Sequence, residues 1–169
     1  MDLSTLLAKQ LHGCNDIEWH DAPQPVSEGI LLCVPDGMSA FAQHGSGSEY
    51  AMWNGVVFWI DSEGEQYALA ASVDDLVDAL HVEAGALYDT MRACQGPGYA
   101  PSTAPLEELQ SRFDTSWLDA QLQSSLERYP AQGALREWAK AQGRGAPRDL
   151  AARLVALRPA LAALRALQT

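Results

Sequence analysis

Four residues near the N-terminus are of the types that bind metal ions. They lie within one short segment and are His12, Cys14, His20 and Asp21. Structural zinc sites use paired ligands at short, fixed spacing, whereas this segment holds one H-x-C pair and no second pair follows it. The sequence therefore predicts no metal site, and no other motif in it indicates a cofactor.

A second candidate is the segment 44–48, which reads His-Gly-Ser-Gly-Ser and offers a base and hydroxyl nucleophiles. A phosphate-binding loop leads into a helix with a Lys, and a nucleophile elbow places G-x-S-x-G between a strand and a helix. Residues 49–53 have the composition of another strand instead. The segment is interpreted as a connection between strands, and His44 stays a candidate base.

The third group consists of carboxylates around a predicted turn and on a predicted helix: Asp61, Glu63, Glu65, Asp74, Asp75 and Asp78. Paired carboxylates can act as general acid and base or hold a divalent cation. Acidic residues are also ordinary at turns and at helix N-termini. Their shared negative charge is the more informative property, because it suits docking to a basic protein.

The overall composition is that of an ordinary soluble domain. The chain has 169 residues, 47% of them apolar, and a net charge of -11, which disfavours nucleic-acid binding. Lys9 and Arg92 are the only cations in residues 1–100, whereas residues 101–169 carry more cations than carboxylates. This asymmetry indicates two different surfaces, or an acidic half that only maintains solubility.

Residues 30–70 alternate between short apolar runs and turns, which predicts an antiparallel β-meander. The strongest signal is Asn54-Gly55, because a two-residue type I′ turn needs positive φ at both central residues. This turn would pair Trp53 with Val56.

The same register places three aromatic side chains in one row across three strands, namely Tyr50, Trp59 and Tyr67. The opposite face is also apolar, through Ala51, Phe58 and Ala68. Because both faces of the sheet are apolar, each must be covered. One cover is a helix layer, and the other is a second helix layer or a protein partner.

Helical patterns follow the meander. Ser72 and the acidic residues after it predict a capped helix start, and residues 95–101 are rich in glycine and proline. The final predicted helix carries a stripe of leucines that Pro159 should kink or split: Leu150, Leu154, Leu157, Leu161 and Leu164. The fold class is α+β, with residues 1–95 as an α+β domain and residues 102–169 as a helical extension packed on it.

Cysteine usage and the N-terminus indicate a compartment. Cys14, Cys33 and Cys94 are odd in number and widely spaced, which is typical of free thiols in a reducing cytoplasm. The first residues show neither the basic region nor the apolar run of a signal peptide, and no stretch is apolar enough for a membrane span. A cytoplasmic location without membrane association is expected.

Residues 41–80 contain, in order, a glycine-rich turn at Gly45–Gly47, a strand at Tyr50–Trp53, a hairpin through Val57–Glu65 and a Ser-capped acidic helix at Ser72–Leu80. This order resembles the SUKH superfamily of bacterial toxin-immunity proteins. The resemblance implies a domain that binds a cognate toxin and blocks it without catalysis.

The sequence thus favours a non-enzymatic protein-binding module, most specifically an immunity protein. The expected partner is a toxin or effector with a basic surface, and a homo-oligomer is left open. The expected partner-binding residues are Tyr50, Trp59, Asp61, Glu63, Glu65 and Tyr67. The alternatives are a chaperone or adaptor for a secreted effector, a small hydrolase that uses His44 with nearby carboxylates, and a structural adaptor whose leucine stripe docks a partner helix.

Overall fold

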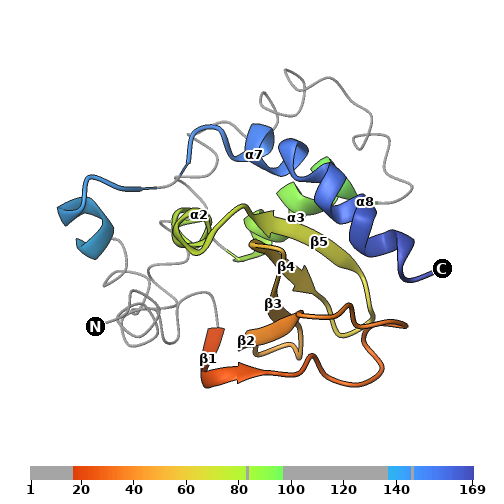
Figure 1. The fold of residues 1–169 in the computed structure, drawn as a ribbon. Coiled ribbons are helices and arrows are strands. Elements are labelled where there is room, and N and C mark those ends of the chain that lie inside the picture. The colour runs from red at the N-terminus through yellow and green to blue at the C-terminus, as the bar shows by residue number, and fades with distance from the viewer. Residues whose placement is uncertain (1–16, 83, 97–136, 146) are drawn as a thin grey trace.

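The computed structural model describes residues 17–82, 84–96, 137–145 and 147–169 (Figure 1). The predictions for His12, Cys14 and the helices expected within 102–136 lie outside these ranges. Five strands form one antiparallel sheet in chain order: β1 (Ile17–Gln24), β2 (Ser39–His44), β3 (Glu49–Trp53), β4 (Val56–Ile60) and β5 (Gln66–Ala70). The helices are α2 (Val73–Ala79), α3 (Ala84–Gln95), α7 (Leu150–Ala156) and α8 (Arg158–Ala166). The α+β class is therefore confirmed.

The meander begins earlier than the predicted 30–70. Strand β1 lies ahead of that range, in a segment that contains Pro23, whereas the residues from Ile30 to Cys33, inside the range, form bends. Proline is tolerated here because β1 is an edge strand, and its pairing with β2 shifts register between Trp19 and Gln24. Leu31 is buried without belonging to a strand.

The central hairpin has the predicted register. Trp53 pairs with Val56 across a turn in which Asn54 and Gly55 both have positive φ, 51° and 79°. Tyr50 pairs with Trp59, which in turn pairs with Tyr67 on β5. The aromatic row across three strands is therefore confirmed.

Helices cover both faces of this sheet. On the face of the aromatic row, side chains such as Tyr67 and Leu69 share a core with residues of α2, α3 and α7. On the opposite face, Phe58 and Ile60 share a second core with Leu161 and other residues of α8. Figure 1 shows α7 and α8 following one another beside β5. The choice left open by the sequence is thus settled, because each face packs against helices of this chain.

The final helix splits where Pro159 predicts. Helix α7 ends at Ala156, and α8 begins at Arg158 with Pro159 in its first turn. Proline is tolerated there because a backbone N–H in the first turn has no partner within the helix. Every leucine of the predicted stripe is buried. The hypothesis that this stripe docks a partner helix is therefore wrong for residues 150–164, because the stripe is part of the chain's own core.

Side chains cover the outer edge of β5. The amide of Gln95 accepts a hydrogen bond from the backbone N–H of Ala68 (2.9 Å) and donates to the carbonyl oxygens of Ala68 (2.9 Å) and Leu154 (2.7 Å). Arg165 donates to the carbonyl oxygen of Gln66 (2.9 Å). The outward-facing backbone groups of Ala68 and Gln66 on this edge strand are thus paired by side chains, which blocks addition of a further strand.

Helix α2 starts as predicted. The Ser72 hydroxyl accepts the backbone N–H of Asp75 at 3.1 Å, which pairs one of the N–H groups that the first helical turn leaves without a partner. In the described residues, no helix is long and apolar enough to cross a membrane.

Gly64 in the β4–β5 turn should not tolerate alanine. Its φ is +88°, and a Cβ there would lie 3.0 Å from the carbonyl oxygen of Ile30. We expect Gly64→Ala to lower the free energy of unfolding by about 1 to 3 kcal/mol in urea denaturation. Gly55→Ala is the matched control, because Gly55 has a similar φ of +79° but no atom within 4 Å of the added Cβ. Equal losses for the two variants would show that the approach to Ile30 is not limiting.

Candidate functional site

The structure separates the six expected partner-binding residues into two groups. Tyr50 and Tyr67 are only 4% and 1% exposed and belong to the core beneath the helices. This corrects the expectation that the whole aromatic row faces a partner. The aromatic row lies on the face of the sheet that packs against α3, and helices cover the opposite face as well. The sequence did not indicate which of the two faces is less completely covered. Trp59, Asp61 and Glu65 are half-buried, and Glu63 is exposed.

Asp61 holds the β4–β5 turn together. One oxygen of its carboxylate, Oδ1, accepts the backbone N–H groups of Glu63 and Glu65, both at 2.8 Å. This is the usual way in which an aspartate stabilises a turn, with its side chain bonded to backbone groups two residues or more ahead. The turn in consequence presents Glu63 at its exposed tip.

Glu65 links the same turn to α3. Its Oε2 accepts hydrogen bonds from the hydroxyls of Tyr67 (2.7 Å) and Tyr88 (3.3 Å). Burial, together with the Glu65 carboxylate, raises the pKa of both phenols above their usual range. The guanidinium of Arg92 lies 5.3 Å from the centre of the Tyr88 ring, on which it makes a cation–π contact. Both phenols stay neutral near pH 7 and act as donors to Glu65.

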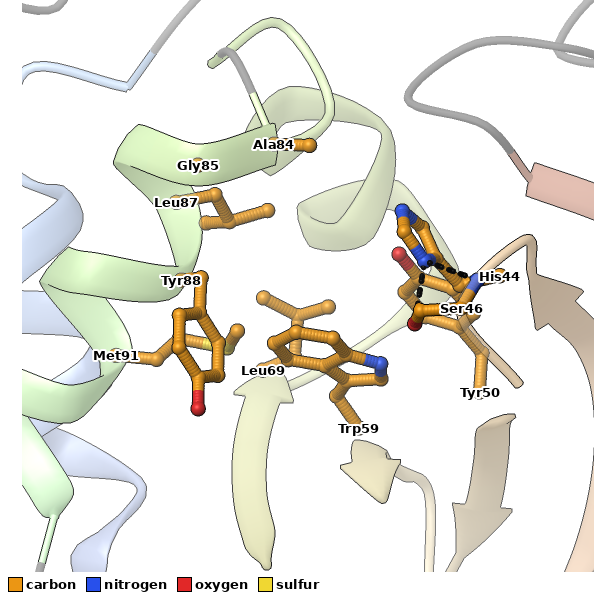
Figure 2. Close-up of a pocket in the computed structure, with 10 residues that line it drawn as sticks. All are labelled: His44, Ser46, Tyr50, Trp59, Leu69, Ala84, Gly85, Leu87, Tyr88 and Met91. Atoms are coloured by element: carbon orange, nitrogen blue, oxygen red, sulfur yellow. Dashed lines mark hydrogen bonds between the residues drawn. The ribbon is translucent and has the colours of Figure 1, made fainter. Parts of the chain in front are cut away.

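A cavity of about 190 Å³ lies between the sheet and α3 (Figure 2). Trp59 lines it, with the ring of Tyr88 edge-on to the indole at a centroid distance of 5.0 Å and the ring of His44 at 6.2 Å. Leu69 and Met91 add apolar surface to the lining. Ser46 and Gly85, which also line it, are exposed, so the cavity reaches the molecular surface between them.

His44 and Ser46 form a local pair at this opening. The His44 Nδ1 accepts the backbone N–H of Ser46 (3.1 Å) and lies 2.8 Å from the Ser46 hydroxyl. Since Nδ1 accepts the backbone N–H, it carries no proton, and the hydroxyl therefore donates to it. A serine bonded to a histidine is within reach of base-assisted nucleophilic chemistry. Asp61 and Glu65 bond to the turn and to tyrosines, and the hydrolase alternative stays a prediction.

Three connections between strands lie close together at the end of the sheet where the cavity opens. A Cβ on Gly47, in the β2–β3 turn, would lie 3.7 Å from Ser62 in the β4–β5 turn. The loop after β1 is attached through Ser27, whose backbone N–H and hydroxyl both donate to the buried carboxylate of Glu49. The cavity opening and the exposed Glu63 therefore lie at one end of the molecule. Sequence reasoning missed the role of Glu49, because its partner lies in another segment.

The acidic residues of α2 are paired with arginines from the C-terminal region. Arg144 contacts Asp74 and Asp78, both at 3.1 Å, and Arg153 contacts Asp75 (3.3 Å) and Asp78 (3.4 Å). These pairs join α2 to residues far along the chain and reduce its contribution to a negative surface. The sequence could not show this, because the partners are separated by more than sixty residues.

Among the residues that the structure describes, the carboxylates of the sheet and its loops make no ion pair. Residues 10–91 contain neither lysine nor arginine. Within the described ranges, every ion pair involves an acidic residue of α2 or Asp149. In the described part of the sheet and its loops, the exposed carboxylates are those of Glu18, Asp21, Glu28, Asp36 and Glu63. Apart from Glu63, these residues were not among the expected site residues.

An exposed apolar patch lies next to this acidic surface, formed by Leu32, Val34 and Leu167. Leu32 is 87% exposed, and Val34 and Leu167 are each 42% exposed. The segments are held together by Gln168, whose side chain accepts the backbone N–H of Cys33 (3.1 Å) and donates to its carbonyl oxygen (2.7 Å). The sequence did not indicate this patch, because Leu32 and Val34 fall within the range 30–70 in which the β-meander was expected.

Comparisons of the chain with protein-family models, with curated proteins and with solved structures found no match. The resemblance to the SUKH superfamily therefore stays a prediction. Among the described residues, no group of three or more histidine, cysteine, aspartate or glutamate side chains is arranged to hold a metal ion.

Proposed function

We propose that this chain is a non-enzymatic protein-binding module, most specifically a cytoplasmic immunity protein that binds and neutralises a bacterial toxin with a basic surface. The observation that carries the proposal is the exposed apolar patch of Leu32, Val34 and Leu167 beside a sheet without cations. Protein interfaces combine an apolar centre with a polar rim, and a single sign of charge steers an oppositely charged partner.

The rim of the patch is acidic. Glu28 and Asp36 lie in the same loop as Leu32, on either side of it in sequence. The β4–β5 turn, which carries Glu63, approaches this loop, because a Cβ on Gly64 would lie 3.0 Å from the Ile30 carbonyl oxygen. The apolar patch and the exposed carboxylates therefore present one continuous docking region to a basic partner.

This docking region differs from the binding site that the sequence predicted. Glu63 remains in it, whereas Asp61 and Glu65 are needed to form the turn and Tyr50 and Tyr67 are in the core. Reversing all three acidic residues of the turn would consequently test folding as well as binding. Leu32 and Glu63 are the better positions for substitution, since both side chains are exposed.

The experiment uses candidate toxins encoded beside the gene, each expressed with the wild-type protein or with a variant. We expect Leu32→Asp and Glu63→Lys each to weaken the complex by about tenfold or more in calorimetry, because they place a charge on the patch or reverse the rim. Protection of the host cell should fall in parallel. Raised ionic strength should weaken the wild-type complex.

Glu137→Lys is the control, because Glu137 is exposed but lies outside the docking region. It makes the same charge change and should protect as well as the wild type. If Leu32→Asp and Glu63→Lys also protect fully, this region is not the binding site. If no candidate toxin is neutralised by the wild-type protein, the immunity function is rejected.

A further inference from the structure

His81 is a titratable residue within the core of this protein. Its side chain is 2% exposed, and the residue lies between Leu80 and Val82, both fully buried, in the short connection from α2 to α3. Histidine is the side chain whose charge ordinarily changes between pH 5 and 8. Its burial places that change of charge where water cannot solvate the ring, which disfavours the charged form.

The hydrogen bonds of His81 determine which ring nitrogen carries the proton. Nδ1 lies 2.8 Å from the carbonyl oxygen of Val77. Because a carbonyl oxygen only accepts, Nδ1 is protonated and donates to it. Nε2 is the nitrogen that would take up a second proton, and it is buried with no hydrogen-bond partner among the described residues. A proton there would create a buried, charged N–H without an acceptor, which costs free energy.

Charged groups from neighbouring elements act on this ring in opposite directions. Asp78 of α2 favours the protonated form, and Arg144, from the segment before α7, opposes it. Asp78 is itself paired with Arg144 (3.1 Å) and with Arg153 of α7 (3.4 Å). Among the described residues no carboxylate, including Asp89 of α3, lies within ion-pair distance of the His81 ring. An imidazolium at this position would therefore lack a carboxylate of its own.

We propose that His81 is an acid-sensitive switch: the connection from α2 to α3 stays packed only while the ring is neutral, and a proton on Nε2 expels it from the core. Helix α3 begins three residues later, and its apolar side chains share the core with the aromatic row of the sheet. Expulsion of His81 would therefore separate α2 and α3 from the sheet and unfold the chain. This inference goes beyond the proposed function, because it concerns the response of the fold to pH and needs no partner.

The direction of the response follows from the burial of the ring. Burial lowers the pKa of His81 below its usual value of 6.5, against the opposing effect of the hydrogen bond to Val77. Below about pH 6.5, the unfolded chain therefore binds more protons at this residue than the folded chain does. The stability that comes from the neutral ring is complete above that pH and is lost as the pH falls through it.

The test compares urea denaturation of the full-length wild type and of His81→Phe at pH 7.5 and pH 5.5. Phenylalanine keeps a ring but cannot be protonated, and its loss of the Val77 hydrogen bond is the same at both pH values. We expect the unfolding equilibrium constant of the wild type, divided by that of His81→Phe, to increase about five- to tenfold on acidification.

His20→Phe is the matched control, because it makes the same change at a half-buried histidine of the edge strand β1. The corresponding ratio of wild type to His20→Phe should stay constant between the two pH values. A constant ratio for His81→Phe, or an equal increase for His20→Phe, would overturn the proposal.

A measurement on the wild type alone keeps the proposal testable if His81→Phe does not fold. Long-range ¹H–¹⁵N NMR distinguishes the two neutral forms of the ring, and we expect His81 to carry its proton on Nδ1 at pH 7.5. Its ring signals should remain those of the neutral form in the folded protein down to pH 5.5. A proton on Nε2 at pH 7.5, or titration of His81 above pH 5.5 in the folded protein, would overturn the proposal.

Discussion

Replacing Gln95 by leucine is expected to lower the free energy of unfolding by about 3 to 5 kcal/mol, measured by urea denaturation. The Gln95 side chain is 3% exposed and makes three hydrogen bonds to backbone groups. Leucine has a similar size but no polar atoms. The substitution would leave both backbone groups of Ala68 and the Leu154 carbonyl oxygen buried without these partners, and each lost partner costs free energy.

Gln168 provides the matched control. Its amide pairs with the backbone of Cys33 in the same two-bond geometry, but this pair lies at the exposed surface. Water can replace the lost bonds there, so Gln168→Leu should cost less than about 1 kcal/mol. Similar losses for the two variants would contradict the view that burial makes the Gln95 pairing important.

The second large effect is expected at Leu164 on α8. This side chain is fully buried against the face of the sheet opposite the aromatic row. We expect Leu164→Ala to lower the free energy of unfolding by about 2 to 5 kcal/mol. The loss combines the lost burial of the side chain with the cavity that remains. Thermal or urea unfolding of the purified variant measures it.

Leu167 lies less than one helical turn beyond and is the comparison. Leu167 is 42% exposed. We expect Leu167→Ala to lower the free energy of unfolding by less than about 1 kcal/mol and to weaken binding of the partner at the docking region. The two variants thus distinguish a leucine of the core from a leucine of the proposed docking region. If Leu164→Ala were as stable as the wild type, the leucine stripe would not be a core element.

The features that the sequence predicted correctly are mostly local. Asn54-Gly55 determines its own turn, and the turn determines which residues of β3 and β4 pair. Pro159 ends one helix and starts another because of its own ring geometry. The Ser72 cap needs only a backbone N–H three residues ahead. In each case the determining interaction lies within a few residues.

The features that the sequence did not reveal depend on contacts between distant segments. Strand β1 was missed because Pro23 usually indicates a loop and only pairing with β2 makes the segment a strand. The burial of Tyr67 depends on where α3 lies. The candidate cavity combines side chains from four strands, a turn and α3, and its size is a property of their packing. No periodicity in the sequence encodes such a space.

The absence of lysine and arginine from residues 10–91 has a practical consequence for mapping a complex. Trypsin cuts after those residues, so it would release all five strands in a single peptide that ends at Arg92. Reagents that react with amines would label Lys9 and Lys140 and leave the sheet unmarked. Cross-linking chemistry that activates carboxylates is the one that would join Glu28, Asp36 or Glu63 to a lysine of a bound protein.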